Sequence, residues 1–212
     1  MIRATALALA LAALTGCSRT EKKADTAAQP AVSADTARPW RKPGDKIDSI
    51  LPMAEYLRRF REGLIEPKQL TGGEPTREAL ARKFLAAVSA QDTTALGHLL
   101  ISRAEFAWLV FPAHVYSRPP YELDPAIFWL QIQAGSQKGL TRLLKRLGGQ
   151  PLTLLLMRCQ RDTLQVKAGP AQLWSDCRMR YRRGAEEESH RLFGSIVERD
   201  GRFKLFSLAN DF

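Results

Sequence analysis

The sequence predicts an α+β domain in which N-terminal helices pack on one curved antiparallel sheet. Up to about residue 147, apolar side chains recur every three to four positions, which is the spacing of one face of a helix. After Pro151 the pattern changes to the apolar runs and two-residue alternation of strands. Helices followed by strands favour an α+β arrangement. With 212 residues, of which 45% are hydrophobic, the chain can bury one core of ordinary size.

Residues 1–16 are typical of a secretory signal peptide that is removed from the mature protein. Arg3 precedes an apolar run, Ala4 to Leu14, and small residues follow it. This run is too short to cross a membrane about 30 Å thick as a helix. We therefore expect the protein to be exported.

The end of this segment, Leu14-Thr15-Gly16-Cys17, resembles the lipobox of bacterial lipoproteins. The resemblance implies cleavage just before Cys17, a diacylglyceryl group on its sulfur and a further acyl chain on its amino group. Several such chains hold a soluble domain on a bilayer. Ser18 stands where a signal for inner-membrane retention usually has Asp, which favours the outer membrane, facing the periplasm, in an organism with two membranes. The alternative is an incidental thiol after an ordinary signal peptide.

Residues 17–47 begin with the lipidated cysteine and continue as a segment rich in Ala, Thr, Pro and mixed charge. Such a segment cannot bury enough surface to offset its ordering entropy, so we expect a disordered tether. The single globular α+β domain is expected over residues 48–212. Most of the formal net charge of +10 belongs to this domain and favours contact with anionic surfaces.

Helices of the domain are expected to begin where residues that cap free N–H groups precede an apolar periodicity. These starting points are Asp48-Ser49, Thr76, Asp92, Ser102 and Asp124. The last of them opens the longest helix, Pro125 to Leu147, which Gly148-Gly149 ends. Gly135 and Gly139 inside this helix predict a kink or a close helix approach. The prolines in residues 112–124 predict a loop without regular structure.

Strands are expected at residues 152–159, 163–167, 171–181, 191–199 and 202–209. The last two are joined by Asp200-Gly201, a dipeptide that predicts a tight hairpin with positive φ at both central residues. Cys159 and Cys177 would face each other in a hairpin centred on Ala168, because that residue is their midpoint. Cross-strand neighbours approach disulfide geometry and an exported protein meets oxidising conditions, so we expect a structural disulfide. The alternative is two buried free thiols.

The segments Arg77 to Leu85 and Ala90 to Leu96 are similar to the first two helices of nuclear transport factor two-like domains, a curved cone shared with SnoaL-like proteins. The order of helices, long antiparallel strands and a final hairpin is similar too, over about residues 75–212. The resemblance implies a cone-like sheet, and in enzymes of this class a few polar groups stand in an apolar pocket. The long helix from Asp124 to Leu147 departs from the family pattern.

A basic stripe is predicted on one face of the strand that contains residues 173–183. Alternation places Trp174, Asp176, Arg178, Arg180 and Arg182 on that face, and Leu173, Ser175, Cys177, Met179 and Tyr181 on the other. With Arg158, these arginines are candidates for contact with phosphate or carboxylate groups. The candidate partners are an anionic envelope polymer, lipid head groups or a protein, since nucleic acid is a poor partner for an exported protein. The alternative is a solvated face, partly neutralised by the acidic residues 186–188.

Aromatic residues gather around the proline loop, within residues 106–129. The candidates for lining an apolar ligand pocket are Trp108, His114, Tyr116, Tyr121 and Trp129. The alternative is that these rings form the core between helices and sheet. No zinc-ligand pattern, phosphate-binding glycine loop or nucleophile elbow is present in the sequence. We therefore expect no metal, no cofactor and no catalytic residues; in an enzyme, the candidate groups would be Glu105, His114, Tyr116 and Asp176.

Together these patterns predict a lipid-anchored protein of the bacterial cell envelope with a non-catalytic binding or interaction domain. The alternative is a small-molecule-binding or enzymatic cone domain whose pocket opens near residues 106–129. A third hypothesis is an assembly factor whose basic face docks on a partner protein.

Overall fold

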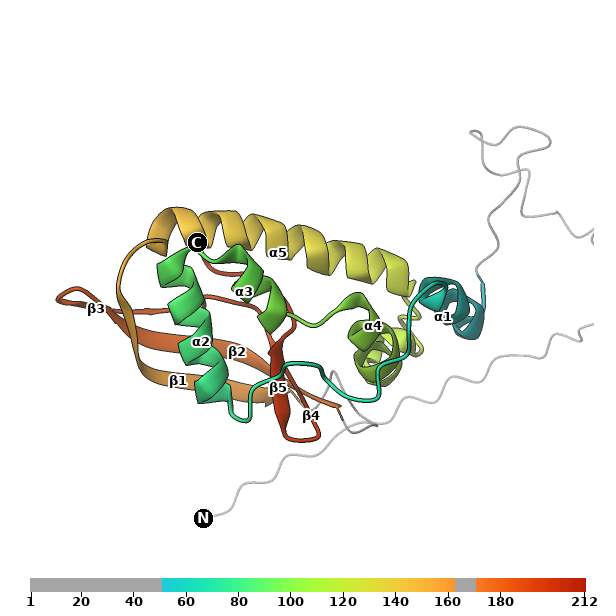
Figure 1. Cartoon of the computed structure of the whole chain (residues 1–212). Coiled ribbons are helices and arrows are strands. Elements are labelled where there is room, and N and C mark those ends of the chain that lie inside the picture. The colour runs from blue at the N-terminus through green and yellow to red at the C-terminus, as the bar shows by residue number, and fades with distance from the viewer. Residues whose placement is uncertain (1–50, 163–170) are drawn as a thin grey trace, which may run out of the picture. The chain divides into compact units, whose positions relative to one another are not determined.

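Helices from the N-terminal half of the domain cover an antiparallel sheet, which confirms the predicted α+β class (Figure 1). The computed structural model describes residues 51–162 and 171–212. The signal peptide 1–16, Cys17, the tether 17–47 and the strand expected at residues 163–167 lie outside the described residues.

The α-helices are α1 (Met53–Arg61), α2 (Arg77–Ala90), α3 (Thr93–Leu99), α4 (Arg103–Glu105) and α5 (Pro125–Leu147). From α2 onward they begin where the sequence predicts. Side-chain oxygens of Thr76, Asp92 and Asp124 cap α2, α3 and α5, since each accepts a hydrogen bond from a backbone N–H of the first turn. Ser102 caps α4 in the same way. The helix expected after Ser49 begins later, after Pro52.

Residues 106–117 form three tight helical turns, of which the first completes the short helix expected from Arg103 to Val110 and the other two lie beyond it. They are the π-helical turn η1 (Phe106–Val110) and the 3-10 turns η2 (Phe111–Ala113) and η3 (Val115–Ser117). The prediction of a loop without regular structure over residues 112–124 is therefore wrong for its first half. Pro112 is compatible with η2 because a helix leaves the N–H groups of its first turn without partners, so the N–H that proline lacks is not needed there.

The strands are β1 (Leu152–Asp162), β2 (Ala171–Arg183), β3 (Glu186–His190), β4 (Ile196–Arg199) and β5 (Arg202–Leu205). The long strand β2 pairs with β1 along one edge, and its other edge takes β4 near its start and β3 near its end. The hairpin between β4 and β5 has φ angles of 51° at Asp200 and 69° at Gly201, which confirms the predicted turn.

β3 is a strand that the sequence does not predict, since the expected strands cover residues 191–199 and 202–209 and leave out residues 186–190. The strand before the hairpin begins only at Ile196, and the strand after it ends at Leu205. β3 has no apolar alternation; it is held by its pairing with the end of β2, where Glu187 lies opposite Arg182 and Glu186 opposite Arg183. Opposite charges facing each other across strands stabilise such a pair.

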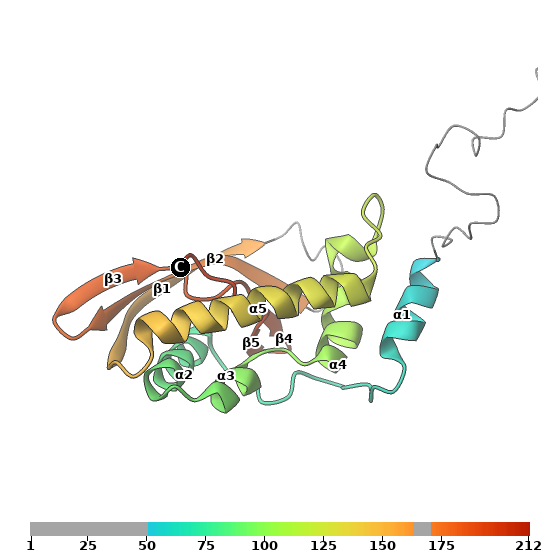
Figure 2. The ribbon, with the colours of Figure 1, turned by 90° about the horizontal axis from the view of Figure 1, so that it is seen from above.

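Two hydrophobic clusters cover the two faces of the sheet at its β4 end. The first lies between the sheet and α2, α3 and the C-terminal half of α5, and it contains Ile196. The second contains Val197 and lies against α1, η1 and the N-terminal half of α5. Successive residues of β4 therefore point into different clusters, as alternation along a strand requires. Figure 2 shows α5 crossing the length of the sheet, which lets one helix serve both clusters.

A close approach occurs at Gly139, one of the two glycines that predict a kink or a close contact in α5. A Cβ atom at this position would overlap the backbone carbonyl of Leu208. The Asn210 side-chain amide donates a 2.8 Å hydrogen bond to the Gly139 carbonyl at the same place. Gly139 thus lets the segment after β5 pack directly against the helix backbone, whereas Gly135 has open space around it.

A β-bulge at Asp176 changes which side chains of β2 face inward. Ser175 lies opposite Gln160 and Arg178 opposite Arg158, so two residues of β2 stand against the single residue Cys159 of β1. Asp176 has a positive φ of 45°. The alternation slips by one residue at this point. The prediction that Trp174 shares a face with Arg178 is therefore wrong, because Trp174 packs on the first hydrophobic cluster together with Cys177.

Candidate functional site

A groove of about 450 Å³ lies on β1 and β2, and none of the helices that the structure describes contributes to its lining. Its lining consists of Leu156, Arg158, Cys159, Gln160, Asp176, Arg178, Arg180 and Ser189. Three of the four arginines that the sequence analysis singled out, Arg158, Arg178 and Arg180, therefore meet in one concavity. Arg182 does not line it and instead forms a 2.9 Å ion pair with Glu187 of β3.

Strand register explains why these side chains converge. Arg158 lies directly opposite Arg178, and Leu156 lies opposite Arg180. Residues that face each other in an antiparallel pair have Cβ atoms about 4.5–5.5 Å apart, so two guanidinium groups can reach one bound anion. Like charges in this position weaken strand pairing when nothing neutralises them. The sheet thus carries a local electrostatic cost at the groove.

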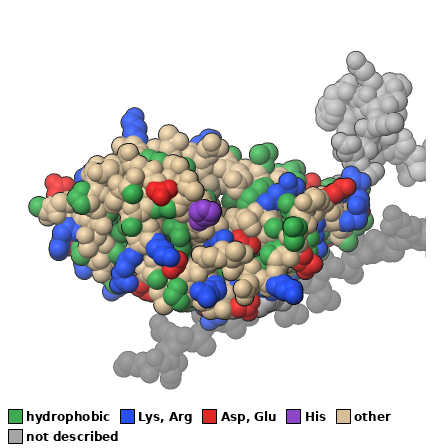
Figure 3. Space-filling view, in the orientation of Figure 1, with side chains coloured by type: hydrophobic (Ala, Val, Ile, Leu, Met, Phe, Trp, Pro, Cys, Tyr) green, Lys and Arg blue, Asp and Glu red, His purple; other side chains and the backbone are tan. Residues whose placement is uncertain are grey.

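Little of this positive charge is neutralised by other residues in the ranges 51–162 and 171–212. The Arg178 Nε atom lies 3.7 Å from the Asp176 Oδ1 atom, and both side chains are about half exposed. The side chains of Arg158 and Arg180 form no ion pair or hydrogen bond with any other residue that the structure describes. On the face that carries α2, α3 and α5, by contrast, Lys and Arg side chains are scattered and acidic side chains stand among them (Figure 3). The groove is therefore a concentrated basic site.

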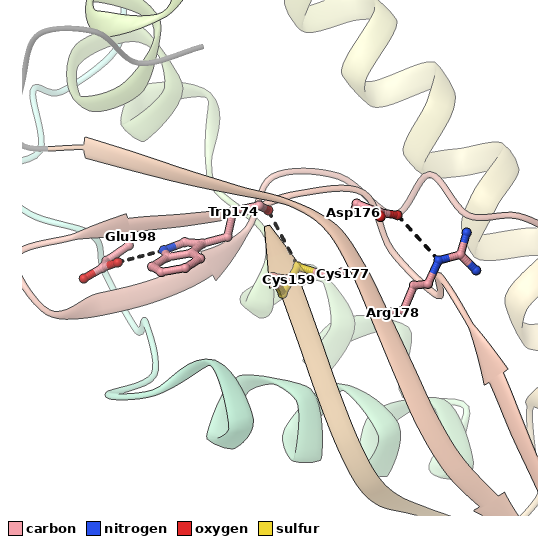
Figure 4. Close-up of a disulfide and its surroundings, with 6 residues drawn as sticks. All are labelled: Cys159, Trp174, Asp176, Cys177, Arg178 and Glu198. Atoms are coloured by element: carbon pink, nitrogen blue, oxygen red, sulfur yellow. Dashed lines mark hydrogen bonds and ion pairs between the residues drawn. A yellow bond between two sulfur atoms is a disulfide. The ribbon is translucent and has the colours of Figure 1, made fainter. Parts of the chain in front are cut away.

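The predicted disulfide between Cys159 and Cys177 is confirmed and forms part of the groove wall. Its S–S distance is 2.11 Å and the two Cα atoms are 4.1 Å apart. Cys177 is fully buried, whereas Cys159 lines the groove next to Arg158. Figure 4 shows the bond between the strands, with the Trp174 ring on one side and the Asp176–Arg178 pair on the other. The covalent link therefore fixes β1 against β2 beside the facing arginines.

The aromatic residues around 106–129 pack mainly against one another. Trp108, Tyr116 and Trp129 contact the second hydrophobic cluster. The ring of His114, which is 1% exposed, lies 4.9 Å from that of Tyr116 and 5.0 Å from that of Phe128. Tyr121 is 58% exposed and touches Tyr116 edge-on. Except for the exposed Tyr121, these contacts match the alternative in which the rings form core, and none of the five residues lines the groove between β1 and β2.

The four candidate catalytic groups do not come together. His114 and Tyr116 lie in the aromatic cluster, Asp176 lies in the arginine groove, and Glu105 pairs with Lys204 of β5. The Lys204 Nζ atom lies 2.9 Å from the Glu105 Oε2 atom, and both residues are buried. Sequence reasoning missed Lys204, because a single lysine in a short terminal strand gives no signal of burial.

The Glu105 carboxylate is saturated with hydrogen bonds. It accepts from both the Lys204 ammonium group and the backbone N–H groups of Thr71 and Ser102, each of the latter at 2.6 Å. Lys204 also donates to the Thr71 carbonyl at 2.9 Å. A groove of about 400 Å³ opens above this pair and has His98 in its lining. Because the buried charges satisfy each other, this pair is a structural ion pair.

A second polar cluster that the sequence did not indicate lies at the junction of β2 and β3. The buried Tyr181 hydroxyl lies 3.1 Å from the Glu188 Oε2 atom and 3.1 Å from the His190 Nδ1 atom. Burial, together with the hydrogen bond to Glu188, raises the pKa of Tyr181. Arg183 pairs with Glu188 at 2.6 Å. These contacts connect the ends of the two strands, and the Tyr181 hydroxyl has hydrogen-bond partners in Glu188 and His190.

Residues 51–162 and 171–212 contain no group of three or more His, Cys, Asp or Glu side chains arranged to hold a metal ion. None of the helices in these ranges is both long and apolar enough to span a bilayer. No protein-family model, curated protein or solved structure matches the chain.

Proposed function

We propose that this protein is a lipid-anchored component of a bacterial cell envelope whose domain binds an anionic partner in the groove between β1 and β2 and catalyses no reaction. One observation carries the binding role: Arg158, Arg178 and Arg180 converge on one groove, and two of the three have no ionic partner among the described residues. An anion bound between Arg158 and Arg178 removes their mutual repulsion. Guanidinium groups bind phosphate and carboxylate in bidentate fashion, which suits this geometry.

The signal peptide and the lipobox-like sequence before Cys17 support the location. Acylation of Cys17 would hold the domain at the membrane surface, with the outer membrane facing the periplasm as the proposed site in a cell with two membranes. In that compartment the available partners are anionic envelope polymers and proteins with an acidic surface. Export separates the protein from nucleic acid.

The same proposal includes a distant relationship to the cone-like nuclear transport factor two-like domains. It is supported by the pair of capped helices α2 and α3, the antiparallel sheet and the final hairpin of β4 and β5. The long helix α5 and the packing of the rings of residues 106–129 distinguish this domain from a cone with an open apolar pocket.

Replacing Arg158 with glutamine is expected to weaken binding of a polyanion such as dextran sulfate about tenfold, because a hydrogen bond to a charged group contributes roughly 1.5–3 kcal/mol. Arg180→Gln should have a similar effect. Isothermal titration calorimetry at one fixed ionic strength measures these affinities, since exposed charges are screened by salt.

The matched control for the groove variants is Arg182→Gln, which removes the same charge from the same sheet outside the groove. Arg182 is already paired with Glu187, so we expect its loss to change the affinity less than threefold. An equal loss in all three variants would mean that only diffuse charge attracts the polyanion. Absence of polyanion binding to the unaltered protein would refute the proposed role.

Replacing Cys17 with serine is expected to move the protein from the membrane fraction to the soluble periplasmic fraction of a bacterial host. The thiol is the proposed acylation site, and a serine hydroxyl does not replace it in the lipobox pattern. Metabolic labelling with an alkyne fatty acid should mark the unaltered chain and leave Cys17→Ser unmarked. If both forms are soluble, cleaved and unlabelled, the segment is an ordinary signal peptide.

A further inference from the structure

We infer that the arginine groove takes a hydroxyl-bearing anion, namely a phosphorylated or carboxylated sugar unit, and that Asp176 distinguishes this ligand from a bare anion. The inference rests on the proposed function, because it concerns the same groove and names the class of its ligand. It starts from the one carboxylate in the groove lining.

Asp176 is placed in the groove by the bulge of β2. Its φ of 45° lies in the left-handed region, which is uncommon for residues other than glycine and is best tolerated by Asn and Asp. Its carboxylate is about half exposed beside Arg178. A site for a bare phosphate gains nothing from a carboxylate here, since like charges repel. A ligand that donates hydrogen bonds gains a strong acceptor.

Asp176 and the other side chains that line the groove follow one another in a fixed order along β1 and β2. Asp176 and Gln160 form one end, Arg158 and Arg178 form the middle, and Arg180 and Leu156 form the other end. Arg180 lies four positions after Asp176 along β2, which corresponds to about 13 Å. The lining therefore changes from hydrogen-bonding groups through paired cations to a cation beside an apolar side chain.

This order matches the chemistry of a sugar that carries an anionic group. Hydroxyl groups of the ring can donate to Asp176 and bond to Gln160, while the phosphate or carboxylate lies between the facing arginines. Leu156 is 40% exposed and offers an apolar contact for the C–H face of a second unit. The groove volume of about 450 Å³ lies within the range of small-molecule sites, roughly 300–1,000 Å³.

The experiment compares sugar anions with their hydroxyl-free counterparts on the full chain purified in detergent. The probes are glucose 6-phosphate against inorganic phosphate, and glucuronate against acetate, with glucose as the neutral probe. We expect each sugar anion to bind roughly tenfold more tightly than its counterpart, through one added hydrogen bond to a charged group. Glucose alone should show no binding, because it lacks the charge that the arginines hold.

Asp176→Asn should reduce both ratios to about twofold or less and leave the affinity for inorganic phosphate equal or higher. Asn tolerates the same left-handed backbone, so the bulge is retained. Asp200→Asn is the matched control, because Asp200 also has a positive φ, of 51°, and lies in the remote β4–β5 turn. It should leave both ratios unchanged.

The outcomes separate this inference from the proposed function. If inorganic phosphate binds as tightly as glucose 6-phosphate, or if Asp176→Asn keeps the tenfold preference, the sugar assignment is wrong while the anion site stands. If neither the sugar anions nor inorganic phosphate bind and dextran sulfate fails as well, the proposed function itself is refuted.

Discussion

Replacing Lys204 with methionine should lower the free energy of unfolding by about 3–5 kcal/mol, because it leaves the buried Glu105 carboxylate without its cation. The carboxylate would keep only the N–H groups of Thr71 and Ser102 as donors. The loss is a large share of the total stability of a domain of this size, which is typically about 5–15 kcal/mol. Thermal unfolding should shift downward by on the order of 10 °C.

Urea unfolding followed by circular dichroism measures this effect, with Arg182→Met as the control. Arg182 also pairs with a glutamate, Glu187, but the two side chains are 51% and 45% exposed. An exposed pair contributes at most about 1 kcal/mol. Combining Lys204→Met with Glu105→Gln should recover part of the loss, because the uncompensated buried charge is then removed. Equal losses in Lys204→Met and Arg182→Met would contradict the structural role of the buried pair.

Reduction of the Cys159–Cys177 disulfide should lower the free energy of unfolding by about 3 kcal/mol. The two cysteines are 18 residues apart, and a cross-link of that length restricts the unfolded chain by roughly this amount. Urea titrations with and without a dithiol reductant measure the difference, and alkylation followed by mass measurement verifies that both thiols are free.

The control for reduction is the double variant Cys159→Ala and Cys177→Ala, whose unfolding midpoint should not respond to the reductant. The unaltered protein should approach the stability of this variant once reduced. An unchanged midpoint with both thiols alkylated would show that the unfolded chain is not restricted by the bond, contrary to the expectation from loop closure.

Local chemistry made much of the fold predictable. Thr76, Asp92, Ser102 and Asp124 precede helices because their short side chains satisfy free N–H groups, and this requires no knowledge of distant residues. The turn at Asp200-Gly201 is local in the same sense. The disulfide is predictable because Cys159 and Cys177 are equally far from residue 168 along the chain. The neighbouring residues Arg158 and Arg178, which are also equally far from it, lie directly opposite each other.

The parts that the sequence did not reveal depend on distant partners. β3 is a strand because its acidic residues meet Arg182 and Arg183, and composition alone describes it as a solvated segment. The bulge at Asp176 is one residue long, so two-residue alternation read through it places Trp174 on the wrong face. Lys204 is buried by Glu105, which lies 99 residues earlier in the chain.

The sequence predicts Arg178 and Arg180 on one basic face and Arg158 as a further candidate contact, but it does not predict that the three converge on a concavity. Arg178 and Arg180 share a face by alternation along β2, whereas the position of Arg158 depends on the register with β1. Arg182 lies on the same face of β2 by alternation, but its side chain pairs with Glu187 of β3 and does not line the groove. The difference between these four arginines therefore comes from the neighbours of each strand.

The position of β2 makes ligand binding and folding a linked equilibrium. β2 contributes buried side chains to both hydrophobic clusters, and it also carries Asp176, Arg178 and Arg180 of the groove. Loss of either cluster would therefore dismantle the groove, so a groove ligand binds only the intact domain. By mass action such a ligand at one hundred times its dissociation constant stabilises the folded state by about 2.7 kcal/mol. A rise in melting temperature can thus detect a ligand of the proposed site in a mixed cell extract before the chemistry of that ligand is known.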